Sequence, residues 1–505
     1  MRYPLRPLMF VGTASDVGKS VITAGFCRIL AQDGYHPAPF KAQNMSLNSF
    51  VTPEGLEIGR AQAAQAEAAG IPCHSDMNPV LLKPTGDHHA QLVLHGKPAG
   101  SQSAYDYFMG RDRTSLWEEV RQSYDRLARR FNPVVLEGAG SISELNLRQR
   151  DITNMRMALH AGADVYLIAD IDRGGVFASV YGTLALLPPE EKALIRGVII
   201  NKFRGDARLF VDGRRQLEQL TGVPIAGVLP YYRDIHIEEE DSVVLRQKHV
   251  TYKPGAVNVA ILRLPHLSNF TDFAALERAS GLHVYYTDDP GELSRATVIV
   301  LPGTKNTIGD LLAMRELGVD KAVIAAAAAG VTVIGICGGY QMMGLTIADP
   351  YGVEGEPQTV SGLGLLPVHT VLSREKTTVR RRFRFGSAEG PVCEGYEIHM
   401  GQTVMEGMGD PGLAGAALTG RFGAAVQPLN FPVHADEAPD GYRLSASCWG
   451  TYMHGILDNQ PVVKQLLGVD IPDYRAFKER QYDRLAEHIR ANIDLEFIYS
   501  NLARL

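Results

Sequence analysis

Residues 7–20 read PLMFVGTASDVGKS, an apolar strand-like run that leads directly into a glycine-rich turn. Glycines let backbone N–H groups curl around phosphate oxygens, because a β-carbon there would clash. A helix predicted to follow would add the positive end of its dipole. The standard loop has four residues between its glycines, whereas five separate Gly12 from Gly18 here. The stretch therefore predicts a phosphate-binding loop of a longer type, placed between a strand and a helix.

The residue pair that ends this loop, Lys19 and Ser20, suits phosphate chemistry. A lysine here supplies a cation to the β- and γ-phosphates, and a hydroxyl here is a ligand for Mg²⁺. An ordinary strand–turn–helix corner is the alternative, but it would not need both glycines, the lysine and the serine. We therefore predict a site for ATP and Mg²⁺. The loop residues expected at the nucleotide are Gly12, Thr13, Val17, Gly18, Lys19 and Ser20.

Two later strand ends fit the same site. Glu137 ends the buried-type run VVLE, and the carboxyl end of a strand is where α/β proteins bind ligands. Because hard cations prefer oxygen ligands, Glu137 is a second candidate for Mg²⁺, although a surface acid capping a turn gives the same pattern. Asn201 follows the run GVII, at a place suited to reading a purine base.

Asp151 allows two interpretations. It is flanked by Arg148 and Arg150 in NLRQRDITN. A surface ion pair is one interpretation, and such a pair contributes little to stability. A place at the acyl-phosphate or substrate site is the other, and the residues alone leave both open.

Outward from the loop, nearly continuous apolar runs such as ADVYLIADID and IRGVIINKF alternate with amphipathic stretches such as SVITAGFCRILAQDG. Strands covered on both faces have this composition, and the alternation indicates βαβ units and a parallel sheet. A polar stretch ends near Gly255, after which the rhythm restarts with more antiparallel-looking segments. Because 505 residues exceed a single core, we predict two α/β domains, 1–250 and 251–505.

Composition narrows the class of protein. A net charge of −6 gives no basic footprint for nucleic acid, and the longest apolar runs are strand-sized, far short of a membrane span. The N-terminus does not resemble a signal peptide. The five cysteines are scattered, without metal-site spacing, which favours a reducing compartment and hence the cytoplasm.

In the second half, VTVIGICGGYQMMG places Cys337 between a strand and a helix, surrounded by glycines. This is the cysteine form of a nucleophile elbow, in which small neighbours permit a strained turn and a helix N-terminus favours thiolate. The N–H of Gly338 is expected to form half of an oxyanion hole, and Gly303 in LPGTK the other half. A buried inert cysteine, the alternative, would not need the glycines.

A thiolate nucleophile needs a base within reach. His454, in WGTYMHG, is the favoured candidate, and His399, in GYEIHMG, is its rival. Class I glutamine amidotransferases resemble this half of the chain, but they usually carry a glutamate two residues after the histidine. Ile456 stands there, so we expect a Cys–His dyad whose imidazole is fixed by another group.

Taken together, the chain resembles the cobyric acid synthase family, which joins a dethiobiotin-synthetase-like P-loop domain to a class I glutamine amidotransferase domain. The blocks that carry the resemblance span nearly the whole chain in order: GTASDVGKS, FKAQNMSLNS, EIGRAQAAQAEAAG, MNPVLLKP, VLEGAGS, DIDRGGVFAS, INKFRGD, LPHLSNFTDF, LPGTKNT, GICGGYQMMG, YEIHMG and YMHGILDN. The resemblance implies ATP- and glutamine-dependent amidation of peripheral carboxylates on a corrinoid, adenosylcobyrinic acid a,c-diamide.

By the same resemblance Asp16 and Lys41 are further candidates near the phosphates, Glu137 is a Mg²⁺ ligand, Cys337 the nucleophile and His454 its base. Two rival classes remain. One is a related synthetase, such as the a,c-diamide synthase or a fused cell-wall lipid amidase pair. The other is a partitioning-type ATPase with a decayed amidotransferase tail, against which the glycines around Cys337 argue.

Overall fold

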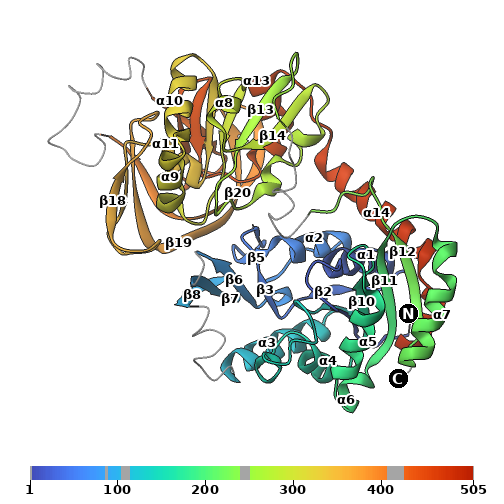
Figure 1. Ribbon diagram of the computed structural model, residues 1–505. Coiled ribbons are helices and arrows are strands. Elements are labelled where there is room, and N and C mark those ends of the chain that lie inside the picture. The colour runs from blue at the N-terminus through green and yellow to red at the C-terminus, as the bar shows by residue number, and fades with distance from the viewer. Residues whose placement is uncertain (1–2, 86–88, 104–113, 239–250, 407–425, 504–505) are drawn as a thin grey trace.

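The structure is a computed structural model that describes residues 3–85, 89–103, 114–238, 251–406 and 426–503. Two α/β lobes lie side by side, each built on its own large sheet (Figure 1). The predicted boundary at 250/251 adjoins residues 239–250, which lie outside the described part. The division into two domains of these classes is confirmed, whereas the position of the boundary stays a prediction.

The first sheet is parallel, and its strands are almost completely buried because helices cover both faces. In spatial order it consists of β12 (Ile225–Pro230), β11 (Ile195–Phe203), β10 (Asp164–Asp170), β1 (Leu8–Gly12), β9 (Val134–Glu137) and β2 (Ala38–Phe40). The covering helices are α1 (Lys19–Gln32), α2 (Arg60–Ala68), α3 (Thr114–Ala128), α4 (Met155–Ala161), α5 (Val176–Leu186), α6 (Pro189–Lys192) and α7 (Val211–Thr221). The predicted parallel sheet is therefore correct.

Two small sheets of the first lobe face the second lobe (Figure 1). One consists of β3 (Gln43–Met45), β6 (Val80–Pro84), β7 (His89–Leu94) and β8 (Lys97–Ser103), and the other of β4 (Ser49–Val51) and β5 (Glu57–Gly59). Val51 packs against Tyr396 and Ile398 of the second lobe in a small apolar cluster. These sheets therefore form the first lobe's side of the interface.

The second sheet begins parallel and becomes antiparallel, as the restarted rhythm predicts. Its strands are β13 (Val257–Leu262), β14 (Leu282–Thr287), β15 (Val298–Leu301), β16 (Thr332–Ile336), β17 (Thr346–Asp349), β18 (Gln358–Ser361), β19 (Val368–Phe385), β20 (Val392–Met405), β21 (Gln427–Pro432), β22 (Asp440–Ser445) and β23 (Cys448–Thr451). The α-helices of this lobe are α8 (Pro290–Leu293), α9 (Thr307–Glu316), α10 (Val319–Ala328), α11 (Gly338–Met343) and α13 (Gln460–Leu467).

The last two helices, α14 (Tyr474–Asn492) and α15 (Leu495–Leu502), return to the first lobe. Leu485 and Ile489 belong to the apolar cluster that contains Phe10 and Phe26 of the first lobe. Arg28 of α1 also binds the Asp483 carboxylate at 2.7 Å. The C-terminal segment of the chain therefore completes the core of the nucleotide lobe.

This packing makes a stability prediction. Ile489→Ala is expected to cost about 3 kcal/mol, because a fully buried aliphatic side chain is replaced by a cavity. Thermal unfolding followed by circular dichroism should show the transition of the first lobe at a lower midpoint. Ile324→Ala, at a position 40% exposed on α10, is the matched control and should leave that midpoint nearly unchanged.

Candidate functional site

The predicted phosphate loop joins β1 to α1. Asp16 and Gly18 both adopt left-handed backbone angles, with φ of 57° and 97°. The loop thereby accommodates its extra residue and curls around the Lys19 side chain. The Lys19 ammonium donates to the carbonyl oxygens of Ala14 at 3.2 Å and Gly140 at 2.9 Å. The lysine is therefore held inside the loop, where phosphate oxygens would replace carbonyls as its partners.

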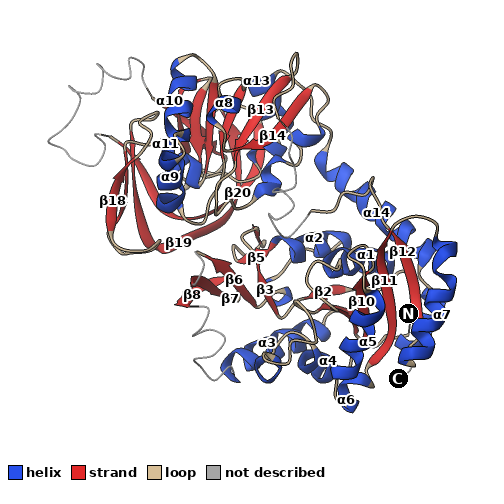
Figure 2. Cartoon of the chain, viewed as in Figure 1, coloured by secondary structure: helices blue, strands red, loops and turns tan. Residues whose placement is uncertain are grey.

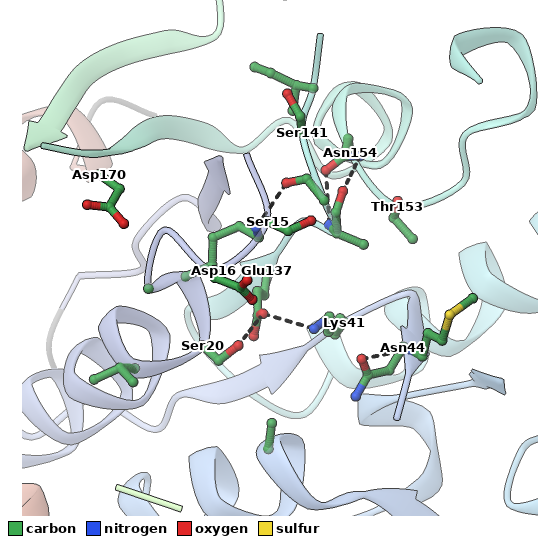
Figure 3. A pocket seen from close by; sticks show the side chains of 18 of the residues that line it. Ser15, Asp16, Ser20, Lys41, Asn44, Glu137, Ser141, Thr153, Asn154 and Asp170 are labelled. Atoms are coloured by element: carbon green, nitrogen blue, oxygen red, sulfur yellow. Dashed lines mark hydrogen bonds and ion pairs between the residues drawn. The ribbon is translucent and has the colours of Figure 1, made fainter. Parts of the chain in front are cut away.

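A cavity of about 870 Å³ opens over this loop (Figure 3). The predicted residues that line it are Asp16, Gly18, Lys19, Ser20, Lys41, Glu137, Asp151 and Asn201. The other three loop residues support it from behind. The Thr13 amide donates to Ile168 O, Val17 packs in the core, and a β-carbon on Gly12 would lie 2.8 Å from Ala14 O. The cavity therefore contains the side chains on which the nucleotide prediction depends.

Glu137 lies at the centre of a buried polar cluster in this cavity. Figure 3 shows Ser20 and Lys41 meeting its carboxylate, with Ser20 Oγ 2.7 Å and Lys41 Nζ 3.0 Å from Oε1. Gln65 Nε2 donates to the second carboxylate oxygen at 2.7 Å. Burial raises the pKa of Glu137, but Lys41 and the hydrogen bonds from Ser20 and Gln65 lower it further, leaving the net shift downward.

The neighbouring oxygens of Ser20 and Glu137 suit a hard divalent cation, because Mg²⁺ prefers hydroxyl, carboxylate and phosphate oxygens. Lys41 occupies the position of positive charge beside them. Ser20 and Glu137 are thus the two residues that would hold Mg²⁺ next to a nucleotide. Their assignment as ligands stays a prediction.

Asp151 caps the chain that enters α4. Its carboxylate accepts from the Thr153 amide at 2.8 Å and from the Asn154 amide at 3.1 Å. Arg148, one of the two flanking arginines, pairs instead with Glu191 at 2.6 Å. Since Asp151 also lines the cavity, its position is compatible with the substrate interpretation, which stays a prediction.

Asn201 lies at the expected strand end, and its side chain binds the phosphate loop. Asn201 Nδ2 donates to Val17 O at 2.8 Å, and a β-carbon on Gly18 would collide with that nitrogen. The side chain thereby stabilises the left-handed turn at Gly18. Recognition of a purine base by Asn201 stays a prediction.

Cys337 stands between β16 and α11 with φ of 52° and ψ of −110°, a strained conformation for a residue other than glycine. The flanking glycines are required by close packing: a β-carbon on Gly335 would lie 2.7 Å from the Tyr340 amide, and one on Gly339 would fall on the Leu301 carbonyl. These contacts and angles are those of a nucleophile elbow.

His454 faces this cysteine and is fixed by an acid from elsewhere in the chain. Its Nδ1 lies 2.7 Å from Asp272 Oδ2, while the Gly455 amide donates to Asp272 Oδ1 at 3.0 Å. The Cys337 and His454 side chains line the same small cavity, and the Cys337 sulfur is directed to Ile398 O at 3.6 Å. Burial lowers the pKa of His454, but the charges of Asp272 and of a Cys337 thiolate raise it more, to about 10.

Asp272 is the acid that contacts the His454 imidazole, where position 456 holds an isoleucine. It comes from a short 3₁₀ helix, Phe270–Phe273, 182 residues before the histidine. In the sequence, Asp272 lies within LPHLSNFTDF, but no local spacing relates it to His454. Cys337, His454 and Asp272 are thus arranged as in a Cys–His–Asp triad, with the acid first along the chain, and their catalytic roles stay a prediction.

His399, the rival base, also borders the cysteine but has different partners. Its Nδ1 lies 2.8 Å from Gly401 O, its Nε2 lies 3.1 Å from Glu397 Oε2, and its ring stacks on Tyr452. Because both ring nitrogens are engaged, the geometry favours His454 as the base of Cys337.

The two glycines predicted for the oxyanion hole lie around the same centre. Gly338 begins α11 directly after Cys337, and its β-carbon position is 3.1 Å from the Thr304 amide. Gly303 lies against the imidazole, 3.0 Å from His454 Cε1 to its β-carbon position. Their placement suits the proposed role, which stays a prediction.

A small cavity of about 50 Å³ surrounds the cysteine. Most of its lining comes from the second lobe, including Cys337, His454 and Lys376, but Lys83 comes from β6 of the first lobe. The interface between the lobes is thus also a wall of this cavity.

Among the described residues, no helix combines the length and apolarity needed to span a lipid bilayer.

Comparison with known proteins accounts for both lobes. Residues 8–243 match the CobQ/CobB/MinD/ParA nucleotide binding domain, and residues 258–462 match the CobB/CobQ-like glutamine amidotransferase domain. Proteins named cobyric acid synthase are similar over the full length. Those from Bacteroides fragilis and Parabacteroides distasonis are each 56% identical, and the one from Chlorobium phaeobacteroides is 46% identical. The matches cover 99% of this chain and 99%, 100% and 100% of those proteins, respectively.

Proposed function

The chain belongs to the cobyric acid synthase family, and from this premise we propose that it amidates the peripheral b, d, e and g carboxylates of adenosylcobyrinic acid a,c-diamide. The product is adenosylcobyric acid, an intermediate of cobalamin biosynthesis. The chain is a glutamine-dependent amide ligase with a nucleotide-binding lobe. ATP, Mg²⁺, the corrinoid and residence in the cytoplasm are the finer parts of the proposal.

One observation carries the proposal: a buried Cys337–His454–Asp272 triad in one lobe and a Lys19–Ser20–Glu137 site in the other belong to a single chain whose lobes share the cavity wall at Lys83. Glutamine hydrolysis does not by itself require a nucleotide site, and nucleotide binding does not require a cysteine nucleophile. Together they suit a synthetase that activates a carboxylate with nucleotide and supplies nitrogen from glutamine.

In the second lobe the Cys337 thiolate attacks the carboxamide carbon of glutamine, forming a thioester. The N–H groups of Gly303 and Gly338 stabilise the oxyanion, and His454 donates the proton that lets ammonia leave. Water then hydrolyses the thioester with His454 as base, releasing glutamate. Burial of His454 beside Asp272 keeps the imidazole oriented through both steps.

In the first lobe a substrate carboxylate attacks the γ-phosphate of ATP, giving an acyl phosphate and ADP. Lys19 holds the phosphate oxygens, and Ser20 and Glu137 would hold Mg²⁺, whose chemistry is to neutralise charge on the β- and γ-phosphates. Ammonia then attacks the acyl carbon and releases phosphate. Exclusion of bulk water keeps the ammonia unprotonated and protects the acyl phosphate.

The test is to incubate the purified protein with ATP, glutamine and corrinoid acceptors that differ in their free carboxylates, and to count new amides by mass spectrometry. Conversion of the a,c-diamide to cobyric acid is expected. Amidation of the a and c carboxylates instead would favour the a,c-diamide synthase. ATP hydrolysis with no amide from any acceptor would favour a partitioning-type ATPase.

Asp272→Asn provides a prediction for the positioning residue. Because Asp272 raises the pKa of His454, its removal lowers that pKa, so the imidazolium form is lost at lower pH. Glutaminase kcat should fall about 100-fold or more, and its alkaline limb should move toward lower pH. The pH profile is the readout, because a merely structural defect would scale the profile without moving it.

Asp349→Asn is a matched control for Asp272→Asn, since Asp349 is another buried acid in the same lobe, whose carboxylate accepts from the Val353 and Glu354 amides. That variant should keep the wild-type position of the alkaline limb. An unchanged limb in Asp272→Asn would remove the aspartate from the triad.

A further inference from the structure

A buried ionic cluster occupies the interface at the wall of the cysteine cavity. Lys83 Nζ lies 2.7 Å from Glu57 Oε1 and 2.6 Å from Ser49 Oγ, while Lys376 of the second lobe binds the other Glu57 oxygen. The Lys83, Lys376 and Glu57 side chains are 5%, 4% and 0% exposed. One carboxylate of the first lobe thus joins a lysine from each lobe.

Both lysines also line the cavity that holds Cys337. The Ser49 amide donates to Asn269 Oδ1 at 2.9 Å, and Asn269 borders the same cavity. Ammonia released at the Cys337 sulfur would therefore reach the nucleotide lobe first at this ionic cluster.

Buried polar side chains continue inward from the cluster. Ser49 pairs in register with Gly59 of β5, whose amide donates to Asn78 Oδ1 at 3.2 Å. Around Gly59, Asn44 Nδ2 donates to Gln62 Oε1 at 3.0 Å. The side chains of this group are at most 3% exposed, so the interior here is polar without being solvated.

The row ends at the nucleotide site. Gln62 and Gln65 are three residues apart on α2 and share one helix face, and Gln65 Nε2 donates to the carboxylate of Glu137. Asn44 and Gln65 both line the nucleotide cavity, where Figure 3 places Asn44 beyond Lys41. The polar row therefore runs from the cysteine cavity to the magnesium and phosphate residues.

Two atoms along the row lack partners among the described residues: Gln62 Nε2, a donor, and Gln65 Oε1, an acceptor. A buried amide group without a hydrogen bond costs about 1–3 kcal/mol. Neutral ammonia can bind both kinds of atom, because it accepts through its lone pair and donates through its N–H groups. An ammonium ion does not match, because it cannot accept and is repelled by Lys83 and Lys376.

Resting on the proposed function, the geometry points to this row as the ammonia passage between the lobes, with Glu57, Lys83 and Lys376 at its entrance and Gln62 and Gln65 along its course. The positive charges of the two lysines repel ammonium. The glutamine amides hydrogen-bond neutral ammonia on its way to the acyl phosphate. Burial lowers the pKa of Lys376 to about 7, although Glu57 opposes that shift.

The decisive variant is Gln62→Leu, which replaces a buried amide by an apolar group of similar size. Glutamine hydrolysis at Cys337 and amidation from added ammonium are expected to persist, whereas glutamate released per amide formed should rise about tenfold. Gln481→Leu is the matched control, since Gln481 is also buried, at 5% exposed, but lies on α14 outside the row. It should keep the wild-type ratio.

An isotope experiment tests the same passage without relying on rates. With glutamine labelled with ¹⁵N in its amide and excess unlabelled ammonium in solution, the wild-type product should carry the label, and the Gln62→Leu product should lose most of it. Gly59→Ala supplies a second variant, since its β-carbon would lie 2.6 Å from Gln62 Oε1 and 2.8 Å from Asn44 Nδ2.

The outcomes separate the two levels of the proposal. Full label retention by both variants, with wild-type coupling, would overturn the passage. A parallel fall of the glutaminase and ammonia-dependent activities would also overturn it, by giving Gln62 only a structural role. A wild-type protein that forms no amide from either nitrogen source would instead contradict the proposed function.

Discussion

Cys337→Ala is expected to abolish amide formation from glutamine, by about 10⁴-fold or more, while added ammonia still supports it. Among the described residues, Cys337 stands at the elbow between β16 and α11, and its side chain lines the same cavity as His454. An alanine keeps the glycine-packed turn but has no nucleophile. Amide yield with each nitrogen source, measured by mass spectrometry of the corrinoid, is the readout.

Cys448→Ala is the matched control. Cys448 lies in β23 of the same lobe, and its Sγ is directed to Leu365 O at 3.6 Å. It should retain glutamine-dependent activity. Loss of ammonia-dependent synthesis in Cys337→Ala would assign the cysteine a wider structural role than nitrogen release.

The parts of the site that the sequence predicts are those set by local backbone geometry. The loop before Lys19 and the elbow at Cys337 depend on glycines a few residues away, because a β-carbon at those positions would clash. Glu137 follows for a similar reason, since the end of a buried strand determines its edge of the sheet. Such local patterns can be recognised in the sequence because residues close together in the chain determine the geometry of these turns and strand ends.

Asp272 shows where such inference ends. Its role depends on the packing of a 3₁₀ turn against a loop 182 residues later, and no pattern in the sequence relates the two. Its carboxylate lies beside the imidazole of His454, whereas position 456 holds an isoleucine. The position of a buried charge is set by tertiary structure, so an apparent gap in a motif can be filled from elsewhere.

Helix α14 is a second limit of the same kind. Its apolar face predicts burial but not the lobe that provides the partner surface. Only the fold shows that Leu485 and Ile489 join the same apolar cluster as Phe10 and Phe26, which lie near the other end of the chain. The passage residues are similar, because Glu57 and Lys376 are 319 residues apart and meet only at the interface.

Lys19→Ala is expected to abolish amidation from both glutamine and ammonia, by about a thousandfold, because the phosphate loop then lacks its cation. The Lys19 ammonium is buried within the loop and held there by two carbonyl oxygens. Basal hydrolysis of glutamine should persist, since the triad lies in the other lobe. Nucleotide affinity by calorimetry and amide yield from each nitrogen source are the measurements.

Lys464→Ala is the control for Lys19→Ala, because Lys464 is an exposed lysine on α13 that pairs with Asp470. Activity should be unchanged there. Persistent ammonia-driven amidation in Lys19→Ala would show that the energy for amide formation does not enter at this loop, and the two-site account would then fail at its first lobe. If instead both nitrogen sources fail together while glutamine hydrolysis remains, the nucleotide lobe acts on the acceptor carboxylate and the triad acts only on the nitrogen donor.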